Sequence, residues 1–406
     1  MRQLLASKFQ TRVSQLDENQ KHRDHHLRRV SSLPVEHRFL FNFSASYTGG
    51  GYKRLHAYAG WFDKNGGAWF AIHPRCSQLI EEFPANRFFV IAHSPGRRLI
   101  DDWSYLNGIV RNTGQPRLYY AYGIPLYRRL GDVNWAHLQN ILLVGRHDVA
   151  LPPFLRAKLA VLGWRFRRGL RNADVVSAES HYSLQLMGQA GFRNLYLSPN
   201  GNDDALEGLR RSGPVSRDNI ATAVGTISYK ALEDTMTVFE TLRRISPGLE
   251  LVVFGAPEWV PAPLRRHPHV HLRGLVPRAQ VIECLRRSRF FISTSRVENS
   301  SNAAAEGMYL AERSFVTDIP PHAELLFGER FERVELPGLS RPLLHVEMNR
   351  LHGANITVWD SVIRGVIARV EMLEGCAPLL RGPRRVLETR TDEQHQAEQW
   401  EPGKGT

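Results

Sequence analysis

The sequence contains few cysteines and no long hydrophobic run. Cys76, Cys284 and Cys376 are the three cysteines among 406 residues, and they lie far apart. This usage is typical of a reducing compartment and argues against a disulfide framework or a cysteine-based metal site. Because no stretch of about 18 apolar residues occurs, the sequence predicts no transmembrane helix. Residues 1–29 lack the apolar segment and the cleavage site of a secretory signal, so we expect a cytoplasmic protein.

Acidic residues are also in short supply. Lys and Arg number 53 against 40 Asp and Glu, which gives a net charge of +13. Such an excess indicates an anionic partner, and nucleic acid, an anionic bilayer and phosphorylated small molecules all qualify. No nucleic-acid-binding motif accompanies the charge, so nucleic acid is not expected. The apolar fraction of 42% is ordinary for a globular protein and excludes wholesale disorder.

The positive charge is concentrated between Arg146 and Arg171, where seven Lys or Arg stand against one Asp. The pattern predicts a basic amphipathic helix over 153–171, with Trp164 among the basic residues. Its apolar face is formed by Leu155, Leu159, Leu162 and Phe166. Two interpretations remain open: a surface helix whose basic face is solvated, or a helix that lies on an anionic membrane.

The chain divides into five segments by composition. Its length exceeds the size at which one hydrophobic core stops growing, which predicts two domains. Residues 1–36 are a basic extension, strand and helix patterns alternate over 37–205, and the alternation restarts over 206–345 after a segment rich in turn residues. A helix is predicted within 346–376, packing back on the N-terminal domain, and the polar tail 377–406 is predicted to be disordered.

The alternation itself predicts an α/β protein with two Rossmann-like, doubly wound parallel-sheet domains that face each other across a cleft. Runs that are apolar on both faces and separated by helices are typical of a parallel sheet covered on both sides. Strands are predicted at 38–45, 68–73, 87–94, 117–123, 174–180 and 194–199, and again at 220–228, 249–257, 269–276, 288–295 and 313–320. Helices of the second domain are predicted at 230–245, 277–288 and 301–311. Ligands of such sheets bind beyond the carboxyl ends of the strands, so the loops there are candidate sites.

The loop after the first strand of each domain can bind an anion. Gly49, Gly50 and Gly51 open a helix, so the backbone can approach an anion while helix N–H groups point at it. These glycines do not form the dinucleotide fingerprint, and a plain tight turn is the alternative. In the second domain Lys230 stands at a helix start, where a cation and N–H groups can hold a diphosphate.

The segment "SRVENSSNAAAEG" follows the fourth strand of the second domain. Asn302 is predicted to be the N-cap of a helix, with Ser301 as the alternative, so that Glu298 lies in the loop and Glu306 in the second helical turn. The alanines at 303–305 leave room for a ligand against the helix start. Glu306 can accept two hydrogen bonds from a vicinal diol such as ribose, while Glu298 faces the group beyond the diphosphate.

Glu298 and Glu306 reproduce an E-x7-E motif, and with it the sequence resembles the retaining nucleotide-sugar glycosyltransferases of family 4 over roughly residues 38–375. Further support comes from the glycine loop and from the segments "NADVVSAESHYSLQLM", "VGTISYKALED" and "TDIPPHAELL". The resemblance implies the GT-B fold. It also implies transfer of a sugar from a nucleoside diphosphate sugar to an acceptor hydroxyl with retention of configuration.

The resemblance also implies residue roles. Glu298 is a predicted catalytic residue near the transferred sugar, Lys230 binds the donor diphosphate and Glu306 holds the ribose. Further predicted donor-binding residues are Gly49, Gly50, Gly51, Gly225, Thr226, Asn299, Ser300, Ser301 and Asn302.

Members of the family commonly have an N-domain histidine near the sugar. His137 is the best match and the second predicted catalytic residue, with His73 and His93 as rivals.

The sequence departs from the family at the diphosphate site. An arginine usually precedes the lysine, but Thr226 and Tyr229 stand in that region here. Either Lys230 works with another cation, such as Arg296 or Arg273, or diphosphate binding is weak. The residue after the first glutamate is often glycine, and Asn299 takes its place.

The predicted mechanism requires no metal and no further cofactor. A diphosphate leaving group needs stabilisation of its negative charge, which Lys230, the glycine loop and the helix start at Asn302 can supply. No pair of aspartates ends a strand, because the pairs at 101–102 and 203–204 lie in helical or linker sequence.

The predicted partners are a nucleotide sugar, a saccharide acceptor and an anionic membrane bound through residues 153–171. The acceptor is either a free or a lipid-linked saccharide. This places the protein in the cytoplasm, peripherally on the inner face of the plasma membrane, in bacterial cell-surface polysaccharide or lipid-linked glycan synthesis. Two alternatives remain: a sugar-nucleotide epimerase of the same fold, and a non-catalytic protein that binds anionic lipid or nucleic acid.

Overall fold

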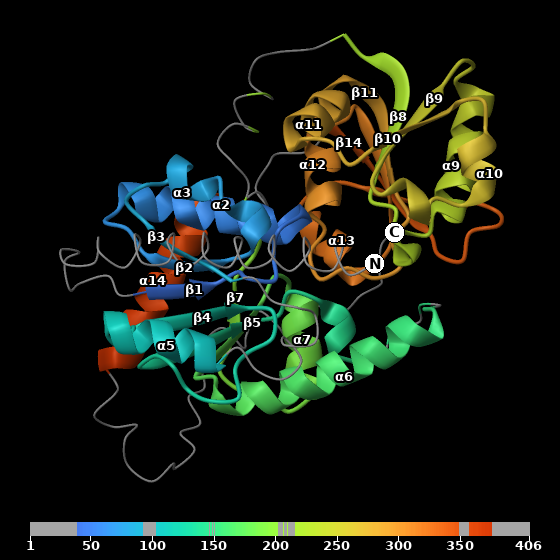
Figure 1. Cartoon of the computed structure of the whole chain (residues 1–406). Coiled ribbons are helices and arrows are strands. Elements are labelled where there is room, and N and C mark those ends of the chain that lie inside the picture. The colour runs from blue at the N-terminus through green and yellow to red at the C-terminus, as the bar shows by residue number, and fades with distance from the viewer. Residues whose placement is uncertain are drawn as a thin grey trace, which may run out of the picture. The chain divides into compact units, whose positions relative to one another are not determined.

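The computed structural model of the chain describes residues 39–91, 103–145, 147, 149, 151–201, 206, 209, 216–348 and 357–375 (Figure 1). The predicted basic extension and polar tail lie outside these residues, as do His93 and the aspartate pairs at 101–102 and 203–204. Residues up to Val366 form one compact unit, and a second unit starts at Ile367.

The first sheet has seven strands in the described part of the chain, all parallel, in the order β3-β2-β1-β4-β5-β6-β7. The strands are β1 (Phe39–Asn42), β2 (Trp69–Ile72), β3 (Arg87–Val90), β4 (Leu118–Tyr122), β5 (Val133–His137), β6 (Val175–Ala178) and β7 (Leu195–Leu197). The strand order reverses between β1 and β4, and ligands of doubly wound sheets bind at such switch points.

Helices cover both faces of this sheet. They are α2 (Gly49–Lys64), α3 (Leu79–Glu82), α5 (Trp103–Thr113), α6 (Pro153–Gly169) and α7 (His181–Gln189), and short 3-10 turns lie at Pro74–Cys76, Ile141–Leu143 and Leu170–Asn172. On one face Phe41 of β1 packs against Tyr58 and Phe62 of α2, with ring centroids 5.3 and 5.0 Å away. On the other face α5 and α6 pack through Leu106 and Phe166. Strands buried on both faces explain the continuous apolar runs in the sequence.

Strand β5 was not among the predicted strands. Its sequence, VNWAH, breaks the apolar run with Asn134 and His137, yet all five residues are buried. The amide of Asn134 donates to the carbonyl of Gly131 (2.7 Å) and accepts from the N–H of Leu130 (2.9 Å). The polar side chain of Asn134 can be buried because its hydrogen bonds are satisfied within the protein. A hydropathy pattern does not register these bonds and therefore does not predict the strand.

The second sheet also has seven strands within the described residues, in the order β10-β9-β8-β11-β12-β14-β13. They are β8 (Asp218–Val224), β9 (Glu250–Phe254), β10 (Val270–Gly274), β11 (Ser288–Ser293), β12 (Arg313–Thr317), β13 (Glu332–Val334) and β14 (Leu343–Glu347). The first five in the chain are parallel, which confirms the predicted doubly wound unit. Strands β13 and β14 are antiparallel additions that the sequence analysis missed. Only β13 is an edge strand, and its three residues, ERV, carry no apolar pattern.

The helices of the second half are α9 (Leu232–Ile245), α10 (Ala262–Arg266), α11 (Arg278–Arg287), α12 (Asn302–Leu310), α13 (Pro320–Leu325) and α14 (Trp359–Gly375), with 3-10 turns at Ser228–Lys230 and Pro257–Trp259. The helices predicted at 230–245, 277–288 and 301–311 correspond to α9, α11 and α12. The first turn of α14 contacts α2, where the indole N–H of Trp61 donates to Asp360 (2.8 Å). Among the described helices, none combines the length and hydrophobicity needed to cross a bilayer.

Candidate functional site

The glycine loop and the start of α12 approach each other. Helix α2 begins at Gly49, as predicted, and Gly49 has φ +60°, a conformation that favours glycine. A Cβ on Gly50 would lie 2.8 Å from the side-chain nitrogen of Asn302. The side chain of the N-cap residue, Thr48, makes no capping hydrogen bond. The backbone of this turn therefore faces the start of α12 at close range, which requires a residue without a side chain.

Glu306 is the centre of a charge cluster. Its carboxylate accepts from Lys53 of α2 (Nζ to Oε1, 2.9 Å) and from Arg278, the first residue of α11 (Nη2 to Oε1, 2.8 Å). Glu306 as a residue is 7% exposed, so these bonds lie in a poorly solvated place and compensate a charge that would be costly alone. Neither cation was among the predicted site residues. The position of Lys53 just after Gly51 was the available signal, because both lie in the first turns of one helix.

Glu298 binds Lys230 directly through an ion pair between Oε1 and Nζ. The lysine side chain runs past Gly225, where a Cβ would lie 2.9 Å from Lys230 Cε. Burial by itself lowers the pKa of Lys230, but Glu298 and Tyr229 outweigh it, and the net pKa is raised above the ordinary lysine value. Lys230 is therefore a fixed cation at neutral pH.

The turn that carries Lys230 is held against the loop after β11. Ala231, the next residue, has φ +48°, a strained value for a residue with a side chain. The hydroxyl of Thr294 donates to the carbonyls of Lys230 (3.0 Å) and Ala231 (2.8 Å). The N–H of Arg296 donates to the carbonyl of Tyr229 (2.9 Å). These bonds fix the Lys230 turn to the loop after β11. The backbone therefore sets the position of the Lys230–Glu298 ion pair.

The two cations proposed to replace the missing arginine form no ion pair with Glu298 or Glu306 in the described part of the chain. Arg296 binds Asp234 of α9 (Nη2 to Oδ2, 3.2 Å), and Arg273 is exposed on β10. The cations that contact the motif carboxylates are Lys53, Lys230 and Arg278.

The N-cap of α12 is Ser301 rather than Asn302. The Ser301 hydroxyl accepts from the N–H of Ala304 (3.2 Å), and Asn302 is already the first helical residue. The extended backbone of Ser301 (φ −90°, ψ 93°) satisfies the geometry of a cap. Among the alanines predicted to leave room for a ligand, Ala304 packs into the hydrophobic core instead, while those at 303 and 305 are half-buried.

Asn299 links the two halves of the chain. Its side-chain oxygen accepts from the hydroxyl of Ser183 in α7 (2.6 Å), and its nitrogen donates to the carbonyl of Leu138 after β5 (2.8 Å). The loop of the motif is thereby fixed to the first sheet. Both polar groups of the Asn299 side chain are used in these two bonds.

His137 is fully buried at the end of β5. Its Nδ1 pairs with the Ser177 hydroxyl (2.8 Å), and its ring stacks on Tyr122 with centroids 5.0 Å apart. Burial first and the nearby charge of Arg54 second lower its pKa to about 4, so the ring is neutral. Its predicted rival His73 caps a 3-10 turn by accepting from the N–H of Arg75 (3.1 Å).

A second buried histidine, His322 of α13, was not predicted. Its Nδ1 lies 2.9 Å from the carbonyl of Thr317, whereas Nε2 is buried and makes no hydrogen bond with the described residues. Burial lowers the pKa of His322 to about 4, although Glu298 acts in the opposite direction. The segment "TDIPPHAELL" contained this histidine, but no local pattern distinguishes a buried ring from a surface one.

The fold has known counterparts. No protein-family model and no curated protein sequence matches the chain. Among solved structures it is similar to sucrose-phosphate synthase from Thermosynechococcus elongatus, with 13% identity, 84% of this chain and 100% of that chain covered, and a TM-score of 0.59. The chain is also similar to AviGT4, a glycosyltransferase involved in avilamycin A biosynthesis. The identity is 12%, the match covers 83% of this chain and 97% of AviGT4, and the TM-score is 0.52.

The chain has the GT-B fold. Anabaena HepE, solved with UDP and glucose, is also similar, with 15% identity, coverages of 86% and 100% and a TM-score of 0.50. A UDP-N-acetylglucosamine 2-epimerase matches with 11% identity, coverages of 87% and 100% and a TM-score of 0.50. At these identities the likeness concerns the fold. Within this GT-B chain, the glycine loop follows β1 and the E-x7-E segment follows β11, so both lie at carboxyl ends of parallel strands.

Proposed function

We propose that this chain is a glycosyltransferase that moves a sugar from a nucleoside diphosphate sugar to an acceptor hydroxyl with retention and without a metal. One observation carries the proposal. On a GT-B fold, both carboxylates of the E-x7-E motif lie at the carboxyl end of β11, and three cations from separate segments converge on them. Such a group of fixed charges suits a ligand that combines a diphosphate with hydroxyl groups.

In this proposal the donor diphosphate competes with Glu298 for Lys230. A doubly charged diphosphate is a stronger partner for an ammonium group than one carboxylate, and the raised pKa keeps the lysine protonated. Glu298 is then released to face the sugar, where it stabilises the positive charge that develops at the anomeric carbon. The N–H groups of Gly49–Gly51 and of Ser300–Asn302 contribute further donors.

Glu306 binds the ribose hydroxyls in the same proposal. Its Oε1 accepts three hydrogen bonds, two from Arg278 and one from Lys53. When the carboxylate turns to the ribose, these two cations lie beside the diphosphate and supply the charge that the missing arginine supplies elsewhere in the family. Lys53 belongs to the first half of the chain, so donor binding involves both sheets.

We assign His137 a positioning role rather than direct contact with the sugar, because the ring is fully buried. The residues that follow it touch the site: the carbonyl of Leu138 accepts from Asn299 (2.8 Å), and the amide of Gln139 donates to Ser46 before the glycine loop (3.4 Å). The hydrogen bond to Ser177 orients His137 and, through it, this loop.

A nucleotide-sugar panel screened by thermal shift tests the donor site. A ligand at 100 times its dissociation constant adds about 2.7 kcal/mol of stability, which is readily detected. We expect one or more nucleoside diphosphate sugars to stabilise the wild type, and EDTA to leave that shift unchanged. No stabilisation by any member of the panel would contradict the proposal.

A sugar-nucleotide epimerase is the second candidate, favoured by the structural likeness to the UDP-N-acetylglucosamine 2-epimerase. Product analysis separates the two reactions. A transferase releases nucleoside diphosphate in proportion to glycosylated acceptor. An epimerase instead converts the donor with no acceptor present. A protein that only binds lipid or nucleic acid does neither.

We further propose that the acceptor is a lipid-linked saccharide and that the enzyme works peripherally at the cytoplasmic face of the plasma membrane, in cell-surface polysaccharide or lipid-linked glycan synthesis. The support is the net charge of +13 and the basic helix α6. Basic side chains attract an anionic leaflet, and exposed charges lose this attraction at high salt.

A further inference from the structure

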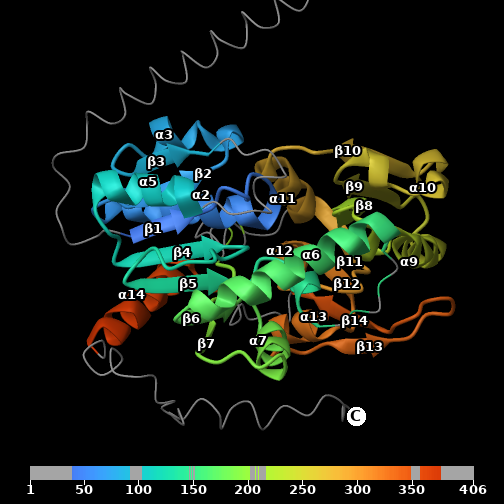
Figure 2. The ribbon, with the colours of Figure 1, turned by 60° about the horizontal axis from the view of Figure 1, so that its bottom comes forward.

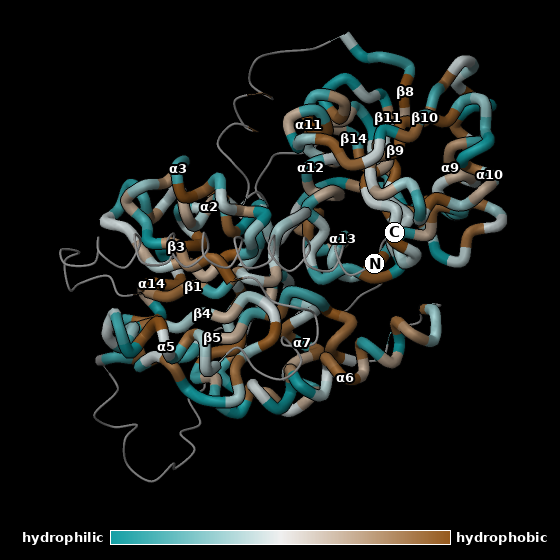
Figure 3. The backbone as a smooth tube through the Cα atoms, in the orientation of Figure 1, coloured by the Kyte–Doolittle hydropathy of each residue, from teal (hydrophilic) through white to brown (hydrophobic). Residues whose placement is uncertain are grey.

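Helix α6 has two apolar faces rather than one. The predicted face packs into the first half of the chain, where Leu159 and Phe166 are buried in a core cluster. The outward side is not purely basic, because Phe154 is 79%, Val161 50% and Trp164 54% exposed. At 100° per residue these three lie within one stripe of the helix, together with Arg168. Figure 3 shows hydrophobic and hydrophilic residues alternating along α6, and Figure 2 looks onto its outer side.

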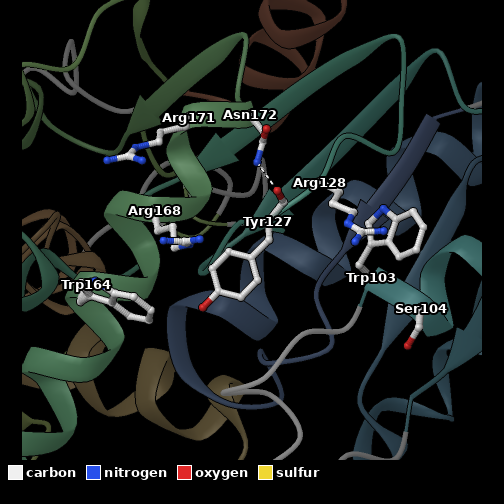
Figure 4. Close-up of a pocket in the computed structure, with 8 residues that line it drawn as sticks. All are labelled: Trp103, Ser104, Tyr127, Arg128, Trp164, Arg168, Arg171 and Asn172. Carbon is white, nitrogen blue, oxygen red and sulfur yellow. Dashed lines mark hydrogen bonds between the residues drawn. The ribbon is translucent and has the colours of Figure 1, made fainter.

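This stripe ends at a pocket of about 920 Å³. The pocket lies between α6, the start of α5 and the segment that joins β4 to β5, and its main lining residues are Trp103, Tyr127, Arg128, Trp164, Arg168 and Arg171 (Figure 4). It is separate in sequence from the E-x7-E segment and from the glycine loop. All of its lining residues belong to the first half of the chain.

Aromatic rings hold two guanidinium groups of the pocket, those of Arg128 and Arg168, in place. Arg128 lies over Trp103, 4.8 Å from the ring centroid. Arg168 lies 5.8 Å from both the Tyr127 and the Trp164 centroids. The guanidinium group of Arg165, which is buried, lies 4.9 Å from the Tyr127 centroid. Figure 4 shows Tyr127 between the side chains of α6 and the Arg128–Trp103 pair.

Three arginines of the pocket have no anionic partner in the part of the chain that the structure describes. Among the described residues, no carboxylate forms an ion pair with Arg128, Arg168 or Arg171. The nearby carboxylate of Asp174 is bound by Arg129 instead (2.6 Å). Arg128 and Arg168 are held by rings, Arg171 lines the pocket beside them, and none of the three is paired with a carboxylate of the described residues. Together they form a site for an anion with several acceptor oxygens, which a phosphate group provides.

We propose that this pocket binds the phosphate headgroup of an anionic bilayer lipid while Phe154, Val161 and Trp164 enter the interfacial region beside it. The inference rests on the proposed membrane location and is independent of the transferase chemistry. The exposed stripe selects a lipid over a free phosphate, because a soluble anion needs no apolar contact beyond the pocket. Aromatic rings next to basic groups are favoured at the headgroup level.

Vesicle sedimentation of the full chain tests the proposal. The probes are phosphatidylcholine vesicles with and without phosphatidylglycerol, at low and high salt. The pocket variant replaces Arg128, Arg168 and Arg171 by Ala. Its matched control replaces Arg244, Arg265 and Arg266, three exposed arginines of the second half, and removes the same net charge.

We expect the wild type to sediment with anionic vesicles and to be released by salt. The pocket variant should bind on the order of a hundredfold more weakly, because each basic side chain near an anionic surface contributes roughly fivefold, and the control should bind like the wild type. Trp164→Ser should weaken binding, whereas Trp259→Ser, at an equally exposed tryptophan, should not.

Several outcomes overturn the proposal. They are wild-type protein that stays in the supernatant, equal losses in the pocket variant and its control, equal binding to neutral vesicles, and inorganic pyrophosphate or RNA bound through the same arginines in preference to vesicles. Nucleoside diphosphate affinity is measured in parallel. If the pocket variant keeps it, the two sites are separate. If the wild type lacks it but still binds vesicles, only the transferase proposal fails.

Discussion

Single residues decide how charge is placed at the candidate site. Lys230 holds Glu298, while Lys53 and Arg278 hold Glu306, so each motif carboxylate is compensated by cations that a diphosphate can share. We expect Lys230→Ala to weaken nucleoside diphosphate binding by roughly 1.5–3 kcal/mol, the contribution of a charged hydrogen bond. Isothermal titration measures the loss, and Lys64→Ala, at an exposed lysine of α2, is the control. Equal affinities in wild type and Lys230→Ala would sink this placement of the diphosphate.

Glu298 and Glu306 should respond differently to substitution. Glu298→Gln should lower turnover, because the proposed role of Glu298 is realised as charge develops on the sugar. It should not weaken donor binding, because the substitution removes the carboxylate that competes with the diphosphate for Lys230. Glu306→Gln should weaken both the nucleoside diphosphate and the donor sugar, since the ribose is common to them. Steady-state kinetics with binding measurements distinguish the patterns. A loss of affinity for Glu298→Gln as large as for Glu306→Gln would contradict the division of roles.

A single residue, His322, also makes the free energy of unfolding depend on pH. Burial lowers its pKa to about 4, whereas an unfolded chain gives about 6.5. As the pH falls below 6.5, the unfolded chain takes up a proton at this histidine while the folded chain does not. His322 alone therefore lowers the free energy of unfolding by about 3 kcal/mol by the time the pH reaches 4. Urea unfolding at several pH values measures this. His322→Asn keeps a donor to Thr317 and should remove this contribution, leaving that of His137, whereas His181→Asn at an exposed position should leave the pH dependence unchanged.

At the scale of helices and strands, a glycine can let two elements pack closely where a side chain would clash. Gly307 of α12 lies against Phe291 of β11, and a Cβ would fall 2.3 Å from that ring. Gly307→Ala should therefore destabilise the protein by about 1–3 kcal/mol through overpacking. Gly108→Ala in α5, where nothing lies within 4 Å, should instead stabilise it by up to about 1 kcal/mol. Thermal unfolding of both variants measures the difference, and a stable Gly307→Ala protein would show that α12 can shift away from β11.

At the scale of the whole molecule, contacts between the two sheet-containing halves pass directly through the motif loop. Asn299 joins Ser183 and Leu138, and Lys53 joins Glu306 across 253 positions of sequence. A double-mutant cycle of Asn299→Ala and Ser183→Ala should show a coupling of about 0.5–3 kcal/mol in unfolding. Additive effects would mean that this bond contributes nothing to the association of the halves.

The sequence by itself determined the alternation of strands and helices, because buried strands and amphipathic helices leave periodic apolar patterns in a local window. It also located Glu298, Glu306, Lys230 and the glycine loop, since their signal is spacing at the carboxyl end of a strand. The tertiary structure decided which partners these residues have. Lys53 and Arg278 reach Glu306 only through packing of α2 and α11, and no local pattern encodes such a distance. The same holds for β5, whose polar residues are satisfied by distant groups, and for the outward stripe of α6, which is known only once the other face is buried.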